Sequence, residues 1–310
     1  MRVAITGGTG YVGSALRRLL EARGDEVIVV RRGRPADPTA MWDPERNWFV
    51  PGALEGVDAV VHLSGASIGA QRWTAARRAE LRASRVDSTR VLVDHLRTLE
   101  HPPKVLVTAS ATGYYGNSGA VERSEGDAKG SGFLADLVAD WEREADRATE
   151  IGMRVVHARL GPTIARDSEL IGRLLLPFRL GLGGPLGSGR QWFSWVATED
   201  VVRGIAFMID HTSLSGPVNL VAPRAATNLE FTKALGRALH RPAVLPLPAL
   251  VLRLAFGRDL ADEMLLSDQR VVPAKLGAAG FEFTHPTIEH ALDAAFAKQV
   301  PASMATGVLR

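Results

Sequence analysis

The sequence predicts an α/β fold, a doubly wound parallel sheet with a smaller C-terminal α/β lobe. Three observations predict it. Short apolar runs alternate with helical patterns over the first 165 residues, the order found in sheets that helices cover on both faces. The runs VIVV and VLV are continuous rather than alternating, as in parallel strands buried on both faces. The first run leads through a glycine-rich turn into a helical segment, and a second strand follows at the distance of a βαβ unit.

The expected elements follow one another in a regular order. The apolar runs predict strands at Arg2–Thr6, Glu26–Val30, Ala59–Leu63, Lys104–Thr108, Arg154–Arg159 and Val218–Val221. Helical patterns lie between and after them at Ser14–Ala22, Thr74–Leu99, Leu134–Thr149, Val201–Asp210, Asn228–Leu239, Leu247–Phe256, Leu260–Leu266 and Thr287–Ala297. No internal repeat or low-complexity tract interrupts this order.

The glycine-rich turn carries glycines three residues apart, at Gly7, Gly10 and Gly13. A strand, a glycine loop and a helix together present backbone N–H groups and a positive helix end to a pyrophosphate. The first glycine allows the tight turn, the second lets the backbone approach the phosphates, and the third lets the helix pack closely. A turn without a ligand is the structural alternative. We predict a dinucleotide on this loop, beside Thr9, Tyr11 and Val12.

Two arginines, Arg31 and Arg32, directly follow the second predicted strand. An acidic residue at this place binds the ribose 2′-hydroxyl of NAD, whereas an arginine accommodates the 2′-phosphate of NADP. The segment VIVVRRGR contains no acidic residue, and we therefore predict NADP(H) as the cofactor. The alternative is a pair of solvated arginines in a turn.

The third strand ends in small residues, Leu63, Ser64 and Gly65. Ligands of a doubly wound sheet bind outside the carboxyl ends of its strands, and small residues there let the backbone pass close to the cofactor. Arg85 on the following helix is placed to reach the phosphates or the ribose. The alternatives are a plain turn at the strand end and an arginine on a solvated helix face.

The fourth strand ends near Ser110, and Tyr114 and Tyr115 follow it, two of only three tyrosines in the chain. This is where a nicotinamide ring and a substrate carbonyl are expected to meet. Leu160 and Gly161 end the fifth strand in a turn that we expect to close over the nicotinamide end. Aromatic packing beneath a loop is the alternative for the tyrosines.

A glycine-rich stretch at residues 181–189 precedes Arg190, Gln191 and Trp192. This much glycine favours a loop that feeds a short strand. Because the stretch follows the main sheet, we interpret these three residues as candidates for binding a substrate. The alternative is that they anchor the lobe to the core.

The composition indicates which partners and metal sites are not expected. Hydrophobic residues make up 46% and charged residues 23%, as in ordinary soluble enzymes. The net charge is +3 without a long basic run, so no nucleic-acid partner is expected. The chain has no cysteine and no H-x-x-H or HExxH spacing, so no metal site is expected. No apolar run approaches the roughly 20 residues of a membrane helix, and no signal-peptide region is seen, so we expect a cytoplasmic protein without a membrane partner.

Several motifs together resemble a known family. TGGTGYVG, VHLSGA, SRVDST and SATGYYG are similar to an extended short-chain dehydrogenase/reductase. More narrowly, LADLVADWE, PFRLGLGGPLGSGRQWFSW, NLVAPRAATNLEF and QRVVPAKLGAAGFEF resemble the atypical "epimerase family protein" clade, which has a small C-terminal domain of uncharacterised function. The resemblance runs from Met1 to about Ala297.

The resemblance implies a Rossmann-type core, NADP(H) binding and a substrate lobe. It implies that Glu80 and Arg85 reach the middle of the cofactor, and that Ser110, Leu160 and Gly161 approach the nicotinamide. We divide the chain into an NADP-binding core at 1–165 with a return segment at about 190–225, a substrate lobe at 166–298 with a small C-terminal domain from about 247, and a tail at 299–310.

The sequence departs from the family at its usual acid/base pair. Ordinary members carry a tyrosine and, four residues later, a lysine on one helix face, where the ammonium lowers the pKa of the tyrosine. Here the corresponding segment is Phe133–Val138, and no tyrosine has a lysine four residues later.

Two hypotheses follow from this departure. The first is an NADP-dependent oxidoreductase or nucleotide-sugar epimerase in which Tyr114 or Tyr115 is the acid and Ser110 or Thr112 polarises the carbonyl. The second is a non-catalytic NADPH-binding sensor or scaffold protein. The sequence determines neither the substrate nor the oligomeric state.

Overall fold

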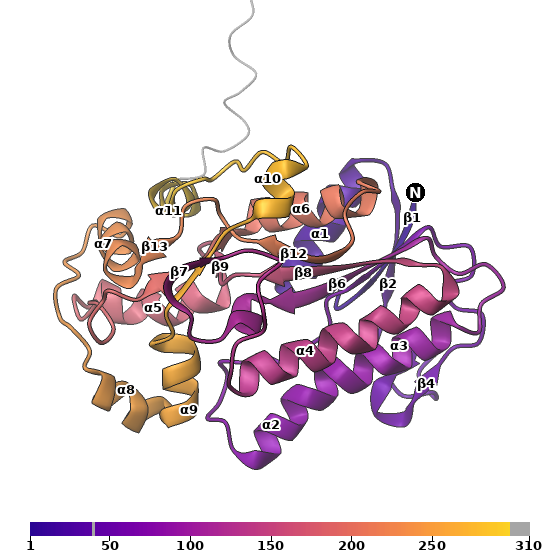
Figure 1. Cartoon of the computed structure of the whole chain (residues 1–310), viewed down its shortest axis with the longest axis horizontal. Helices are drawn as coiled ribbons and strands as arrows, with labels where there is room; N and C mark the ends of the chain where they lie inside the picture. Colours follow the sequence, from indigo (N-terminus) through magenta and orange to yellow (C-terminus); the bar gives the residue numbers. More distant parts are fainter. Residues whose placement is uncertain (39–40, 298–310) are drawn as a thin grey trace, which may run out of the picture.

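The computed structural model describes residues 1–38 and 41–297, and the predicted tail at 299–310 lies outside this range. Its centre is a six-stranded parallel sheet (Figure 1), which confirms the predicted α/β class. From one edge to the other its strands are β12 (Gly216–Leu220), β8 (Arg154–Leu160), β6 (Val105–Ala111), β5 (Ala59–His62), β1 (Arg2–Thr6) and β2 (Glu26–Val30). All five pairings are parallel. The carboxyl ends of these strands therefore meet at one edge of the sheet, where sequence reasoning placed the ligand.

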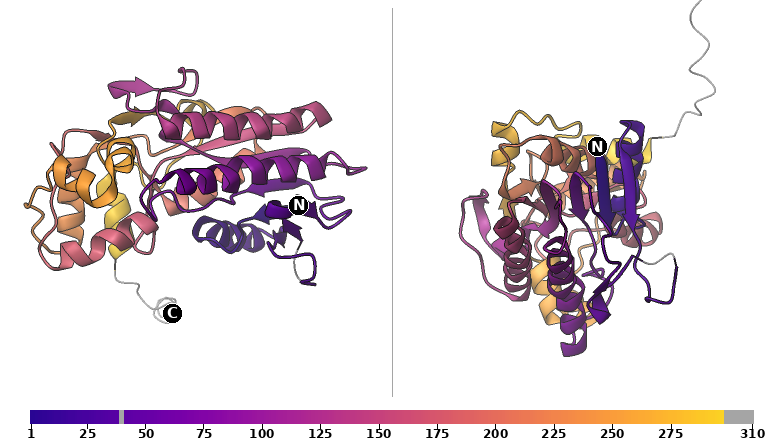
Figure 2. Two further views of the ribbon diagram at one scale, coloured as in Figure 1. Left: turned by 90° about the horizontal axis from the view of Figure 1, so that it is seen from below. Right: turned by 90° about the vertical axis from the view of Figure 1, so that its right-hand side faces the viewer.

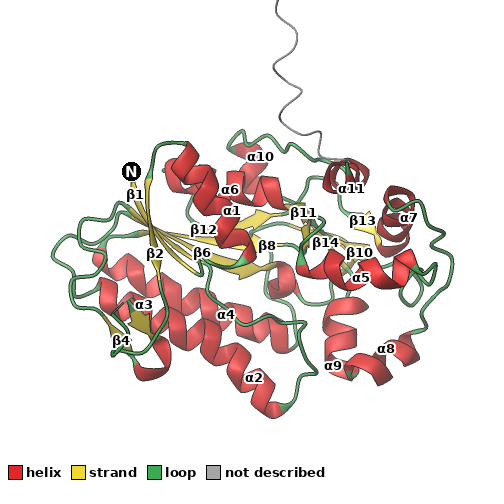
Figure 3. Ribbon diagram, turned by 180° about the vertical axis from the view of Figure 1, so that it is seen from behind, coloured by secondary structure: helices red, strands yellow, loops and turns green. Residues whose placement is uncertain are grey.

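Helices cover both faces of the sheet, with the strands lying between the two helical layers (Figure 3). Helices α1 (Tyr11–Ala22) and α6 (Thr198–Asp210) bury one layer of apolar side chains, which includes Ile5, Leu16 and Ile205. Helices α3 (Ser88–Leu96) and α4 (Phe133–Asp146) cover the opposite face. Burial on both faces explains why the strands read as continuous apolar runs.

The pattern predicted as one helix at Thr74–Leu99 is a helix interrupted by a π-helical turn. It consists of α2 (Ala75–Arg82), the π turn Ala83–Asp87 and α3. Insertions of this kind shift the faces of the flanking helices, and they are frequent at functional sites. Arg85 lies in the turn, and its side chain is buried rather than solvated.

A lobe lies at the end of the molecule opposite β1 and β2 (Figures 1 and 2). Its core is an apolar cluster that includes Phe178, Phe231 and Leu292. These side chains come from α5, α7 and α11, and the remaining helices of the lobe are α8 and α9. The helices of the lobe are α5 (Glu169–Arg179), α7 (Asn228–Ala238), α8 (Ala249–Phe256), α9 (Arg258–Leu260) with a π turn at Ala261–Leu265, and α11 (Ile288–Phe296). Helix α10 (Ala274–Ala278) lies beside the sheet and contacts β12. Helix α5 was not predicted, because glycine and proline mask its apolar pattern.

Over the described residues, four pairs of short strands complete the fold. They are β3 (Trp42–Asp43) with β4 (Trp48–Phe49), β7 (Gly119–Arg123) with β14 (Gln269–Val271), β9 (Thr163–Ile164) with β11 (Val196–Ala197), and β10 (Trp192–Phe193) with β13 (Ala226–Thr227). The short strand expected after the glycine-rich stretch is β10, and the other seven were not predicted. The parallel pair of β7 and β14 joins the middle of the chain to its C-terminal part. Over residues 1–38 and 41–297, no helix combines the length and the apolar character needed to cross a membrane.

Candidate dinucleotide-binding site

The glycine loop after β1 is held in place by close backbone contacts. Gly7 has a φ of +69°, and a Cβ atom there would lie 2.9 Å from the carbonyl carbon and oxygen of Leu63. A Cβ on Gly13 would lie 2.2 Å from the Gly7 carbonyl oxygen. The loop therefore requires glycine at both positions, first for the left-handed turn and then because the helix packs against the loop itself.

The start of α1 fits a negatively charged ligand. Gly10 is the N-cap, no side chain caps the helix, and its first turn contains no acidic residue. The N–H groups of Tyr11, Val12 and Gly13 have no partner within the helix, because the first four amides of a helix never do. Thr9 and Gly10 are exposed beside them. These free donors and the positive helix end are what a pyrophosphate requires.

Two side-chain contacts connect the residues around this loop to the segment after β9. The Tyr11 hydroxyl donates to Asp167 Oδ1 at 3.1 Å and is hydrogen-bonded to Thr198 Oγ1 at 3.0 Å. Burial raises the pKa of Tyr11. The Ser67 hydroxyl, after β5, donates to Glu169 Oε1 at 2.6 Å. Residues 167–169 are therefore tied both to α1 and to the loop that follows β5.

The two arginines predicted to bind a 2′-phosphate follow β2. Arg31 and Arg32 are both exposed, and Arg32 forms an ion pair with the exposed Glu45. The Met41 amide donates to the Arg31 carbonyl oxygen at 2.8 Å. The two arginines thus directly follow the carboxyl end of β2, and Glu45 is the carboxylate beside the Arg32 guanidinium.

Arg85 contacts the turn after β5 directly. Its Nη2 donates to the Ala66 carbonyl oxygen at 2.9 Å, and a Cβ on Gly65 would lie 3.2 Å from its Cζ. Burial lowers the pKa of Arg85 to about 10. Leu63 and Ser64 are half-buried in the same turn. Glu80, by contrast, is exposed and forms a 2.6 Å ion pair with Arg77, so its predicted contact with the cofactor stays a prediction.

A buried polar network lies under the expected nicotinamide end. Arg159 donates to both carboxylate oxygens of Glu142 at 2.8 Å, and the Ser110 hydroxyl donates to Oε1 of the same carboxylate at 2.5 Å. Arg159 also donates to the Tyr115 hydroxyl at 2.9 Å, which in turn donates to Asn219 Oδ1 at 2.8 Å. Burial raises the pKa of Tyr115. The hydroxyls of Ser110 and Tyr115, both catalytic candidates, are therefore occupied in the network.

Tyr114 differs from its neighbour. It is half-buried, and Arg159 Cζ lies 3.5 Å from the centroid of its ring. Over the described part of the chain, the Tyr114 hydroxyl has no hydrogen-bond partner. Leu160 and Gly161 follow Arg159 at the end of β8, and Thr112 is buried before the two tyrosines. Tyr114 is thus the candidate whose hydroxyl is free to act.

The first turns of α4, where the resemblance predicts that the usual acid/base pair is missing, have an apolar face. Leu134, Leu137 and Val138 are all buried. Lys129 is exposed, and its Nζ donates to Asp136 Oδ1 at 2.5 Å. This lysine therefore has a carboxylate partner on the surface rather than a tyrosine partner.

The three residues predicted to bind a substrate differ in burial and in contacts. The Gln191 side chain is buried and donates to the carbonyl oxygens of Leu186 and Leu265 at 3.1 and 3.4 Å. Trp192 is half-buried, with Arg270 Cζ 4.6 Å from its ring centroid. Arg190 is exposed. No contact here tests substrate binding, and the three assignments stay predictions.

Sequence reasoning overlooked the buried Glu142–Arg159 pair and two acidic residues of the C-terminal part, Glu263 and Asp268. A signal for the pair was present, because Glu142 continues the apolar face that contains Val138, and a charge on such a face needs a partner. No local signal marks Glu263 and Asp268, since their partners lie far away in the sequence.

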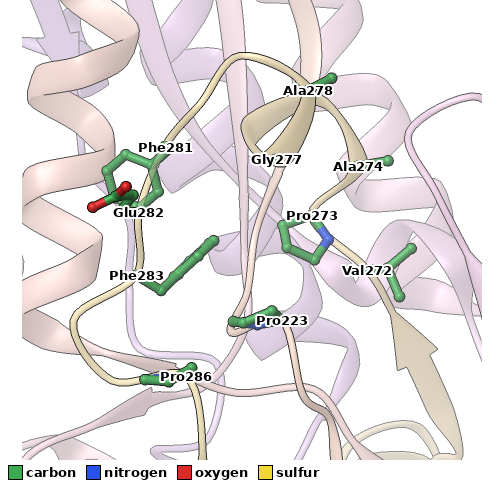
Figure 4. A pocket seen from close by; sticks show the side chains of 10 residues that line it. All are labelled: Pro223, Val272, Pro273, Ala274, Gly277, Ala278, Phe281, Glu282, Phe283 and Pro286. Atoms are coloured by element: carbon green, nitrogen blue, oxygen red, sulfur yellow. The ribbon is translucent and has the colours of Figure 1, made fainter.

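An apolar groove of about 690 Å³ lies elsewhere on the molecule (Figure 4). It is formed by Pro223 after β12, by residues 272–274, 277 and 278, and by residues 281–283 and 286, with Phe281 and Phe283 on one side. None of the residues predicted to bind cofactor or substrate lines this groove.

Comparison with known proteins identifies the family. Residues 3–220 match the NAD dependent epimerase/dehydratase family. The chain belongs to this family. Residues 247–295 match a domain of unknown function, DUF1731. The resemblance to the epimerase family proteins of the short-chain dehydrogenase/reductase type is thereby confirmed.

Relatives in this family match along nearly their whole length. An epimerase family protein of Mycobacterium bovis is 45% identical over 291 residues, which cover 94% of this chain and 96% of that protein. The human epimerase family protein SDR39U1 is 38% identical over 295 residues, covering 94% and 98%. The solved structure of human SDR39U1 (isoform 2) with NADPH has a TM-score of 0.86 at 35% identity, covering 96% of this chain and 99% of the other.

A second solved structure extends the comparison. The nucleoside-diphosphate sugar epimerase from Corynebacterium glutamicum has a TM-score of 0.78 at 29% identity. The match covers 96% of this chain but 58% of that one. The Rossmann-type fold is thus shared with proteins of the NAD(P)-binding epimerase and dehydrogenase group.

Proposed function

We propose that this protein binds NADP(H), with the pyrophosphate on the loop from Gly7 to Gly13 and the 2′-phosphate at Arg31 and Arg32. The observation that carries the proposal is the position of the two arginines at the carboxyl end of β2, where an NAD-specific site has a carboxylate. The uncapped start of α1 supports the pyrophosphate position. The NADPH in the human relative supports the choice of cofactor. When bound, this cofactor supplies or accepts a hydride.

The test is a comparison of NADPH and NADH binding by calorimetry and thermal shift. NADPH should bind more tightly and stabilise the folded state more, by mass action. Arg31→Ala should weaken NADPH roughly ten- to a hundredfold, the range for losing a charge-assisted hydrogen bond, and leave NADH unchanged. Arg97→Ala is the matched control, since this exposed arginine pairs with Glu150 at the far end of α3. Equal affinity for the two cofactors would contradict the proposal.

We propose that the reaction is an oxidoreductase or epimerase step in which the Tyr114 hydroxyl acts as the acid toward the substrate carbonyl. Its free hydroxyl supports this role, whereas the hydroxyls of Ser110 and Tyr115 are already hydrogen-bonded to Glu142 and Asn219. Tyr114 lies in the 3₁₀ turn directly after β6, at the carboxyl edge of the sheet.

The apolar face of α4 favours a second candidate function, a non-catalytic NADPH-binding sensor or scaffold. Lys129 is paired with Asp136 and so does not serve a tyrosine. NADPH oxidation over a panel of carbonyl substrates distinguishes the two functions, because a sensor binds the cofactor without turning it over.

A further inference from the structure

Helix α4 begins without a cap of its own. Its N-cap is Gly132, and no side chain near in sequence accepts from the first amides. The Phe133 amide instead donates to Glu263 Oε1 at 3.1 Å, and the Leu134 amide donates to Oε2 at 2.9 Å. A carboxylate from the C-terminal domain, about 130 residues further on, thus caps α4 and balances the positive end of the helix.

Gly132 is shaped around this carboxylate. Its φ is +110°, and a Cβ there would lie 2.9 Å from Glu263 Oε2. A side chain at residue 132 would therefore have to displace the carboxylate or strain the backbone. The contact between the two segments leaves no room for a larger residue.

The capped turn of α4 supports the loop that carries Tyr114. The Gly130 amide donates to the Tyr114 carbonyl oxygen at 2.9 Å. A Cβ on Gly130 would lie 2.2 Å from the Tyr115 carbonyl oxygen, and a Cβ on Gly113 would lie 3.3 Å from Leu134 Cβ. A shift at the start of α4 must therefore move the backbone of Tyr114.

The same C-terminal segment also holds the other side of this loop. The Asp268 carbonyl oxygen accepts from the Ser118 and Gly119 amides at 2.9 and 3.0 Å, and Asp268 Oδ1 accepts from the Trp192 amide at 2.7 Å. Gln269 Nε2 donates to the Gly116 carbonyl oxygen at 2.8 Å. Residues 263–269 therefore join α4, the Tyr114 loop and Trp192.

We propose that Glu263 is a positioning residue for Tyr114, and that the C-terminal domain completes the nicotinamide end of the cofactor site. The phosphate end is left to β1, α1 and β2, which Glu263 does not touch. This inference rests on the proposed function, since it assumes NADP(H) at the carboxyl edge of the sheet. If the proposal is right, disturbing Glu263 changes binding at the nicotinamide end of the cofactor and leaves binding at its phosphate end unchanged.

The test compares Glu263→Gln with Glu289→Gln. The first substitution keeps one acceptor oxygen but turns an amide N–H₂ toward a helix N–H, whereas exposed Glu289 of the same domain forms only an ion pair with Arg237. Adenosine 2′,5′-bisphosphate probes the phosphate end in calorimetry, and the fluorescence emission of bound NADPH probes the nicotinamide surroundings. Glu263→Gln should keep the wild-type Kd for the bisphosphate, shift the NADPH emission toward that of free NADPH, and weaken NADPH roughly tenfold, within the range of helix-cap substitutions.

Gly132→Ala is the second variant, because it displaces the carboxylate while keeping Glu263, and it should reproduce the emission shift even where Glu263→Gln does not fold. Unchanged emission and NADPH affinity in both variants would overturn the inference alone. An equal loss of bisphosphate and NADPH binding in a folded variant would also overturn it. A wild-type protein that binds neither ligand would instead refute the proposed function, and this inference with it.

Discussion

The buried pair of Glu142 and Arg159 should be highly sensitive to substitution. Glu142→Ala removes the acceptor of two Arg159 hydrogen bonds and of the Ser110 hydroxyl. The guanidinium then stays buried without a counter-charge. Breaking a buried pair from one side costs about 3–5 kcal/mol, a large share of the total stability of a folded protein.

The expected change in melting temperature follows from the chain length. An unfolding entropy of about 2.1 cal/mol/K per residue gives about 0.65 kcal/mol/K for 310 residues. A loss of about 3–5 kcal/mol therefore lowers Tm by about 5–8 °C. Differential scanning calorimetry on the ligand-free protein measures the shift directly.

Two comparisons make the test decisive. Glu150→Ala removes an exposed ion pair with Arg97 and should lower Tm by less than about 2 °C, since exposed pairs contribute about 0–1 kcal/mol. Glu142→Leu combined with Arg159→Met removes both charges and should recover part of the loss. Surface substitutions change Tm by ~1–2 °C or less. A Glu142→Ala variant that melts within that range of the wild type would refute the predicted cost of breaking the pair. A double variant that is less stable than Glu142→Ala would refute it as well.

Three further outcomes are expected. Burial lowers the pKa of His62 to about 4, so the folded state favours the neutral imidazole. The free energy of unfolding should therefore fall by about 3 kcal/mol as the pH drops from 6.5 to 4, taking the unfolded pKa as about 6.5. Urea unfolding of His62→Gln should show a shallower dependence on pH than that of the wild type. Gly13→Ala should abolish NADPH binding in fluorescence titrations while Gly172→Ala, whose Cβ meets nothing within 4 Å, should not. Tyr114→Phe should abolish NADPH turnover with intact NADPH binding, and retained turnover in both this variant and Tyr115→Phe would exclude the tyrosines as the acid.

Most of the fold was predictable because the strands of the main sheet and most of the helices have a local pattern. The runs at β1, β2 and β5 are apolar and bounded by glycine or polar residues, and the helices between them have apolar faces. The glycine loop was predictable for the same reason, because Gly7, Gly10 and Gly13 lie close together in the sequence and form one local motif. The short strands other than β10 were not predicted, because segments of two to five residues carry little periodicity.

Around the expected nicotinamide end, the partners of the candidate residues could not be predicted, because these contacts join residues that are far apart in the sequence. Ser110 and Tyr115 were chosen as reactive hydroxyls, yet Glu142 and Asn219 occupy them, and neither partner is near in sequence. Glu263 is about 130 residues from the helix that it caps. Such pairings follow from tertiary structure and leave no mark on a local pattern.

The pairing of β7 with β14 also has a consequence for synthesis on the ribosome. Gln269 bonds to Gly116 across 153 residues, so the neighbours of β7 emerge long before their partner does. At ~5–20 residues per second, β7 waits roughly 8–30 s with an unpaired edge, while the main sheet can already assemble. Nascent chains that stall before residue 263 should therefore display a folded core with an incomplete loop around Tyr114 and an open strand edge, the kind of surface that chaperones bind.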